Sequence, residues 1–256
     1  MKYDVITSVL AKSISAIFSF LVLIYTSRTL GVDLRGEFAF ALAIALTISA
    51  FISISIENSY ISLFKNSEQK AQLRKVFLTL VVYLGTLCFL FTLLLVSFIN
   101  FGFHINVILI ALSGALTLIS KCLVGLYLAD GDLIKYNVNS IYIKFLYLLL
   151  AVLAIDLFYL EVEGLFYAYI VSTLTFIFMV VKGKKLKLKL KPTGNKCISK
   201  TLLVNSLKIH STTIGTLLVT QVPLVLLGTF SDKKNVALFD TALQITSVLT
   251  LAVSSL

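Results

Sequence analysis

The chain has 256 residues, of which 59% are hydrophobic and only 13% are charged, and its mean hydropathy is +1.01. A typical soluble domain carries about 25% charged residues, so this composition excludes an ordinary soluble fold. The formal net charge is +10, but the lysines lie between apolar blocks, which argues against a nucleic-acid binder.

The apolar residues form successive blocks of the length that spans a bilayer, about 20 residues per helix. Backbone groups in lipid must be satisfied internally, which leaves helices or a closed barrel. Barrel strands are short and alternate in polarity, whereas these blocks are long and continuous. The sequence therefore predicts an all-α integral membrane protein, a polytopic bundle of about eight transmembrane helices. The expected spans are residues 11–29, 37–56, 76–99, 107–128, 140–160, 163–181, 201–228 and 236–256.

The distribution of basic residues predicts the orientation of the bundle. No small-residue cleavage pattern follows the first apolar run, so we expect an uncleaved first helix. With the N-terminus in the cytoplasm, the basic linkers 57–75 and 182–200 are cytoplasmic as well. The Lys and Arg residues left on the outer side are then Arg28, Arg35, Lys233 and Lys234. This asymmetry follows the positive-inside rule and favours a cytoplasmic N-terminus.

The long basic segment also divides the chain. Residues 1–181 are expected to form a six-helix lobe, residues 182–200 a basic cytoplasmic loop, and residues 201–256 the first two helices of a second lobe. The step Leu30-Gly31 recurs loosely as Leu227-Gly228, as in transporters built from parallel repeats. The last helix stops at Leu256 without a polar tail, so we expect a truncated chain.

Lysines inside the spans are the candidate functional residues, because a charge at the centre of a membrane helix costs about 2.5–3.5 kcal/mol. Lys121 shares a helical face with small and polar residues, which suits either a cavity or a side chain that snorkels to the headgroups. Lys208 belongs to a polar stripe that could line a cavity or form a seam between packed helices. Lys144 lies near the start of its helix, where snorkelling is favoured. Pro223 predicts a kink.

The segment from Thr26 to Ala39 resembles the first outer loop of polysaccharide-unit flippases in the multidrug/oligosaccharidyl-lipid/polysaccharide transporter superfamily. The matching positions are Arg28, Leu30, Gly31, Gly36 and Phe38. Two glycines in this segment would allow a tight turn between helices. One departure lies at Leu238-Phe239, where many relatives have Gly-Tyr at the start of helix 8.

The resemblance implies a two-lobed bundle of about twelve or more helices around a cleft. The implied substrate is a polyprenyl-diphosphate-linked oligosaccharide, moved from the cytoplasmic to the outer leaflet of the bacterial inner membrane for O-antigen or capsule synthesis. Lys121 and Lys208 would meet the diphosphate, with Lys144 as a further substrate-binding candidate. Arg28 and Arg35 would receive it outside, or they are interfacial residues beside a glycine turn.

The remaining expectations concern partners and alternatives. The sequence has no P-loop, nucleophile elbow or metal-ligand cluster, so we expect no enzyme activity and no cofactor. Coupling to H⁺ or Na⁺ stays open, and the outer acids Asp156, Glu161 and Glu163 are either interfacial or a cation site. Expected partners are membrane lipids and polysaccharide polymerase machinery. A multidrug extruder of the same superfamily and a membrane scaffold for envelope assembly are the alternatives.

Overall fold

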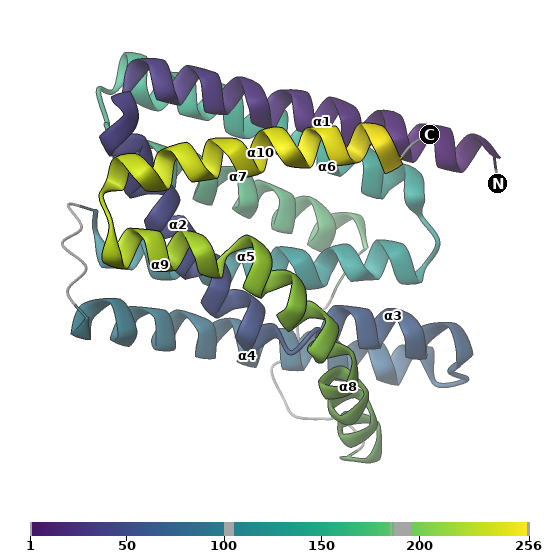
Figure 1. Ribbon diagram of the computed structural model, residues 1–256. Coiled ribbons are helices and arrows are strands. Elements are labelled where there is room, and N and C mark those ends of the chain that lie inside the picture. Colours follow the sequence, from purple (N-terminus) through teal and green to yellow (C-terminus); the bar gives the residue numbers. More distant parts are fainter. Residues whose placement is uncertain (1, 100–104, 185, 187–195, 255–256) are drawn as a thin grey trace.

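The computed structural model describes residues 2–99, 105–184, 186 and 196–254. This part of the chain is helical, with no strand among the described residues. The helices are α1 (Lys2–Thr29), α2 (Gly31–Ser53), α3 (Ile56–Asn66), α4 (Lys70–Phe98), α5 (Val107–Ala129), α6 (Leu133–Val152), a π-helical turn (Leu153–Leu157), α7 (Val162–Gly183), α8 (Lys196–Thr220), α9 (Val222–Phe230) and α10 (Lys233–Ser254) (Figure 1).

Seven of these helices, counted among the described residues, are long and apolar enough to cross a membrane. This confirms the predicted class, a polytopic helical membrane protein. The eighth expected span corresponds to α10, and the side chains of its last residues lie outside the described part of the chain.

Several helices begin earlier than their hydropathy suggests. Helix α1 starts at Lys2 instead of residue 11, and α6 starts at Leu133 instead of residue 140. Hydropathy marks only the part of a helix that fits the hydrocarbon layer, about 30 Å thick. The additional turns carry lysines and polar residues, which suit the interfacial region. The predicted kink at Pro223 is confirmed, since α8 ends at Thr220 and α9 resumes at Val222.

The expected outer loop between the first two spans is wrong. Only Leu30 separates α1 from α2, and Gly31 makes the turn with a φ of +80°. That backbone region is open to glycine and strained for other residues. Gly36 does not form part of the turn but lies inside α2, together with Arg35. The predicted turn therefore needs one glycine, and the second has a packing role.

The second expected span and the linker after it also differ from the prediction. Helix α2 ends at Ser53, and Ile54 and Ser55 both adopt the left-handed region, with φ values of 47° and 53°. Helix α3 follows at once and occupies half of the region expected as a loop. Two consecutive non-glycine residues in this region are uncommon and require support from their surroundings.

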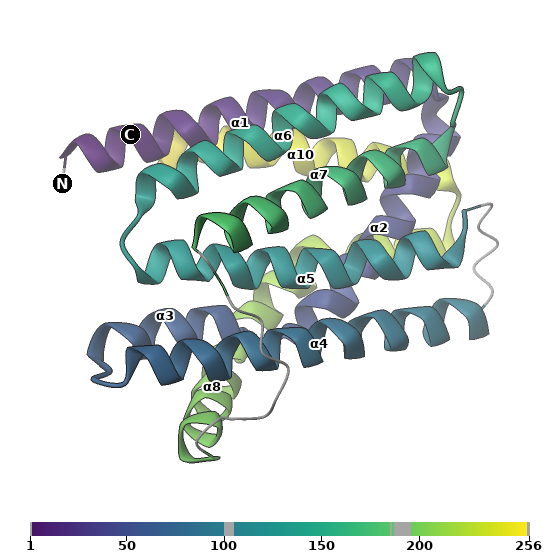
Figure 2. The same ribbon diagram turned by 180° about the vertical axis from the view of Figure 1, so that it is seen from behind.

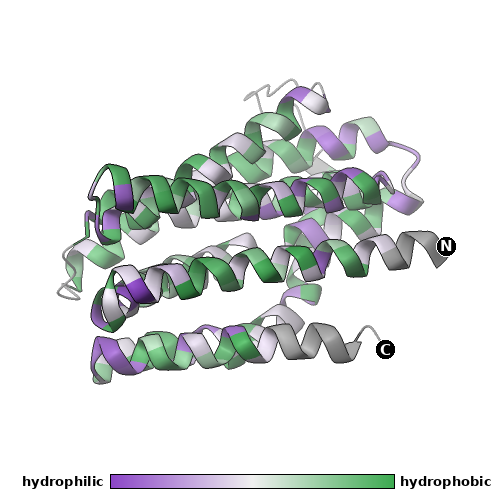
Figure 3. Ribbon diagram, turned by 90° about the horizontal axis from the view of Figure 1, so that it is seen from above, coloured by the Kyte–Doolittle hydropathy of each residue, from purple (hydrophilic) through white to green (hydrophobic). Residues whose placement is uncertain are grey.

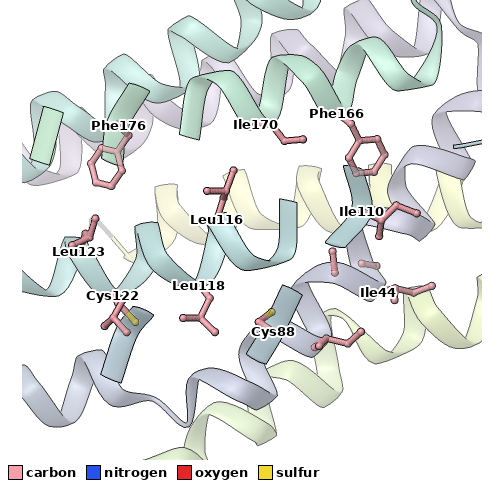
Figure 4. Packing of buried hydrophobic residues seen from close by; sticks show 14 of the residues in the cluster. Ile44, Cys88, Ile110, Leu116, Leu118, Cys122, Leu123, Phe166, Ile170 and Phe176 are labelled. Carbon is pink, nitrogen blue, oxygen red and sulfur yellow. The ribbon is translucent and has the colours of Figure 1, made fainter. Parts of the chain in front are cut away.

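The core of the bundle lies around α5, which runs between α4 and α7 (Figure 2). On one side of α5, Leu116 and Leu123 face Ile170 and Phe176 of α7 (Figure 4). On the other side its side chains face Cys88 of α4. The spans α2, α5 and α7 are the most buried, whereas α1 lies beside α6 at the edge.

Hydrophobic residues dominate the middle of the long helices, and hydrophilic residues gather mainly toward their ends (Figure 3). At the end where α3 meets α4 and α5 meets α6, Asp130 pairs with Arg74 and Lys184 at 2.6 and 2.7 Å. In the same turn, a hydrogen bond from the Lys135 ammonium lowers the pKa of Asp132. These contacts join α4, the α5–α6 turn and the end of α7 at one end of the bundle.

Candidate functional site

A cavity of about 560 Å³ lies among α1, α2, α6, α7, α9 and α10 and reaches the end of α8. Its lining is mainly apolar, with hydroxyl groups from Ser15, Ser140, Tyr147 and Tyr169. Pockets of this size and character typically bind ligands through a few convergent polar groups. The charged residues that line it are Lys12, Arg35, Lys144 and Asp240.

Arg35 is the buried charge at this cavity. It projects from the second turn of α2, and its side chain is only 7% exposed. Its Nη2 donates to Asp240 Oδ2 of α10 at 2.6 Å, and its guanidinium lies 5.4 Å from the Phe38 ring centre. Its Nε and Nη1 are buried without a hydrogen-bond partner among the described residues. Arg35 therefore keeps donors available beside the cavity.

The other two cations, Lys12 of α1 and Lys144 of α6, have no ion-pair partner in the part of the chain that the structure describes. With Arg35 they give three cations against the single carboxylate of Asp240, a net charge of +2 among the lining residues. The sequence favoured headgroup anchoring for Lys144, but the structure places it on the cavity wall. The cavity is thus electropositive and suited to an anion.

The structure brings together two of the five sequence-predicted substrate residues, Arg35 and Lys144. Arg28 is exposed in the last turn of α1, and Lys208 is exposed on α8. Lys121 is on α5. None of these three is among the described residues that line the cavity.

One residue of the polar stripe around Lys208 contacts the start of α3, whereas Lys208, Thr212 and Thr216 are exposed on α8. Asn205 donates to Ser59 Oγ at 3.1 Å. Beside the stripe, His210 Nδ1 and Thr213 Oγ1 lie 3.2 and 2.6 Å from Ser55 Oγ. These contacts support the left-handed backbone at Ser55, whereas Thr220 at the other end of the stripe lines the cavity.

Lys121 pairs with a buried carboxylate at the start of α3. Its Nζ lies 2.8 Å from Glu57 Oε1, and the two side chains are 42% and 6% exposed. Neither carboxylate oxygen has a hydrogen-bond partner among the described residues, so the contact is an ion pair without hydrogen-bond alignment. Gly125, one turn further along α5, leaves the room in which Glu57 approaches the helix.

Replacing Lys121 by methionine should destabilise the protein, because it leaves the buried Glu57 carboxylate without its counter-charge. Losing one partner of a fully buried pair costs about 3–5 kcal/mol, and the partial exposure of Lys121 reduces this to about 1–2 kcal/mol. The measurement is the apparent melting temperature of the detergent-solubilised protein. The double substitution Glu57→Gln with Lys121→Met should recover most of the loss.

Lys208→Met removes the same group from an exposed position and is the matched control for this measurement. If Lys121→Met is as stable as the wild type, the Glu57 carboxylate does not depend on Lys121 for its stability in the bundle.

Sequence reasoning missed Lys12, Asp240 and Gln244 at the cavity. Asp240 lies directly after Leu238-Phe239, where the sequence departs from the pattern of the relatives. The sequence did contain a signal, because Asp240 and Gln244 are an acid and an amide one turn apart in an otherwise apolar segment. Polar and charged side chains of this kind cost free energy inside a membrane. Among the described residues no group of three His, Cys, Asp or Glu side chains could hold a metal ion.

A polytopic helical bundle with a mainly apolar but charged cavity between its helices resembles the architecture of membrane transporters. The family model for polysaccharide biosynthesis proteins matches residues 2–256. The chain therefore belongs to the polysaccharide biosynthesis protein family. A search among curated proteins found no match.

Solved structures share the fold. One chain, described as protein A, superposes with a TM-score of 0.72 at 18% identity, covering 99% of this chain and 62% of its own length. A MOP superfamily transporter from Pyrococcus furiosus, described as having a binding pocket of reverse polarity, has a TM-score of 0.60 at 13% identity, covering 98% of this chain and 64% of its own. An outward-facing multidrug resistance MATE family transporter has a TM-score of 0.60 at 15% identity, with the same coverage of 98% and 64%.

These identities show a common fold and no more. The chain spans between 62% and 64% of the length of these three solved chains. It is accordingly a multi-pass membrane protein that shares the fold of these structures.

Proposed function

We propose that this chain forms part of a flippase that moves polyprenyl-diphosphate-linked oligosaccharides from the cytoplasmic to the outer leaflet, for the synthesis of surface polysaccharide such as O-antigen or capsule. The observation that carries the proposal is the charge of the cavity. Lys12, Arg35 and Lys144 face a space whose single carboxylate is already paired with Arg35. A diphosphate is anionic, and cations in a low-dielectric cavity lower the cost of taking it through the membrane.

The fold alone does not decide between a lipid-linked sugar and a drug, because one fold hosts several functions. Pocket polarity differs even among the fold's solved relatives, one of which is described as having reverse polarity. Cationic drugs call for unpaired acids. In this cavity the carboxylate of Asp240 accepts hydrogen bonds from Arg35 and from Gln244. The charges therefore favour an anionic cargo over multidrug extrusion.

The direction of transport rests on the orientation of the bundle, which we assign with the N-terminus in the cytoplasm of a bacterium. The turns after α3, α5 and α7 carry cations that include Lys70, Lys135 and Lys184. The opposite turns carry mainly acids, such as Asp33, Glu161 and Asp232. The family's role in polysaccharide biosynthesis agrees with a location beside the polymerase machinery in the inner membrane.

The test measures the lipid-linked oligosaccharide pool in cells that lack the gene, with leaflet position probed by a membrane-impermeant reagent. We expect lipid-linked units to accumulate facing the cytoplasm and surface polysaccharide to fall. An unchanged pool and an unchanged surface polymer, in a strain without a second flippase, would contradict the proposal. Increased drug sensitivity in such a strain would favour multidrug transport, and no phenotype beyond mislocalised envelope proteins would favour a scaffold.

A further inference from the structure

We propose that Asp240 is a built-in competitor of the substrate: it occupies Arg35 in the empty cavity, and the anionic headgroup displaces it, which releases α10 from α2. This inference rests on the proposed function, since it assumes an anionic cargo. It adds a way in which the same site is regulated. The contact concerned joins α2 to α10, the last described helix.

The guanidinium of Arg35 has more donors than Asp240 uses. A guanidinium carries five N–H groups in a planar fork that matches phosphate oxygens bidentately. Only Nη2 donates to Asp240, while Nε and Nη1 are buried without a hydrogen-bond partner among the described residues. A phosphate that entered the cavity could satisfy donors that the carboxylate leaves unused, and Lys12 and Lys144 line the same space.

Asp240 is able to leave Arg35 without losing all its contacts. Its Oδ2 also accepts a hydrogen bond from Gln244 Nε2 at 2.9 Å, one turn further along α10. Its side chain is 16% exposed and lines the cavity, so it retains access to polar surroundings. Exchange of one anion for another keeps the buried guanidinium neutralised throughout, which avoids the cost of an unpaired buried charge.

The exchange matters because the Arg35 pair is one of the ion pairs that join α2 to α10 among the described residues. Another joins Lys233 Nζ to Glu37 Oε2 at 2.6 Å, two helical turns before Asp240. Loss of the Arg35 contact therefore removes one of the described ion pairs between α2 and α10. A ligand shifts a conformational equilibrium only through its different affinity for the two states, and competition for Arg35 supplies such a difference.

The experiment measures binding of farnesyl diphosphate, a short polyprenyl diphosphate, to the purified full-length protein by isothermal titration calorimetry, with uncharged farnesol as the reference. Asp240→Asn keeps the size of the side chain but removes the competing charge. We expect it to bind farnesyl diphosphate about tenfold more tightly than the wild type, which corresponds to about 1.4 kcal/mol. Adding Arg35→Gln should abolish this gain.

Asp232→Asn is the matched control, because it removes an exposed acid just before α10 that does not line the cavity. If Asp240→Asn binds no more tightly while Lys144→Ala binds more weakly, the competition is wrong but the anion site stands. If wild type and all variants bind farnesyl diphosphate no better than farnesol, the anionic cargo of the proposed function is wrong as well.

A second measurement uses the unaltered protein and therefore does not depend on a variant that folds. Hydrogen–deuterium exchange of residues 233–247 should be faster with farnesyl diphosphate than with farnesol, because the ligand frees α10 from α2. Slower or unchanged exchange in that segment at saturating ligand would overturn the release of α10.

Discussion

Replacing Lys144 by glutamate is expected to lower surface-polysaccharide restoration in a gene-deletion strain by at least about tenfold, the equivalent of 1.4 kcal/mol. The change takes the charge of the cavity lining from +2 to zero, because one cation becomes an anion. Two unit charges 4 Å apart interact by about 4 kcal/mol at an effective dielectric constant of 20, so reversing one charge near a diphosphate exceeds the tenfold threshold. Quantified surface polymer per cell, normalised to the amount of membrane-inserted protein, is the measurement.

Lys208→Glu provides the matched control, since it makes the same charge reversal on an exposed face of α8 outside the cavity. Lys144→Arg keeps the charge and should retain most of the activity. Equal loss in Lys144→Glu and Lys208→Glu would assign the effect to general charge and not to the cavity. Full activity of Lys144→Glu would remove this lysine from the substrate path.

Replacing Gly36 by alanine, which adds a single methyl group to α2, should lower the stability of the bundle. A Cβ at this position would overlap the backbone carbonyl oxygen and carbon of Lys233, so α2 and the start of α10 would have to separate. Overpacking typically costs about 1–3 kcal/mol, and displacement of backbone instead of a flexible side chain places this change at the upper end. The apparent melting temperature in detergent is the measurement.

Gly215→Ala in α8 is the control, because nothing lies within 4 Å of the added methyl group. Alanine is favoured over glycine in a helix by about 1 kcal/mol, so this variant should be as stable as the wild type or more stable. If Gly36→Ala behaves like Gly215→Ala, the seam between α2 and α10 is looser than the structure indicates.

The close approach at Gly36 and the ion pairs beside it both hold α2 against α10. Gly228 of α9 lies against the ring of Phe40, so glycines on both sides of the seam allow α2 to pack tightly on α9 and α10. Small residues at helix interfaces in membranes permit such approach, where van der Waals contact replaces the hydrophobic effect as the source of stability. The two ion pairs then add charge specificity to a contact already set by shape.

The sequence by itself determined the class of this protein and most of its helices. Apolar blocks of bilayer length leave backbone groups no partner outside the segment, so they specify helices whatever their neighbours are. The residue type also located the kink at Pro223, because proline removes a hydrogen bond from the interior of a helix. The motif at Arg28 and Leu30 led to the family, which matches residues 2–256.

Only the tertiary structure decided which charges meet. Lys121 and Lys144 are both lysines inside apolar helices, and the sequence does not show which group each of them meets. Packing turns the first toward Glu57 of α3 and the second toward a cavity shared with Arg35. The rotation of a helix about its axis depends on the shapes of its neighbours, and no local pattern records it. The pairing of Arg35 with Asp240 joins residues 205 positions apart, so it exists only once α2 and α10 are packed together.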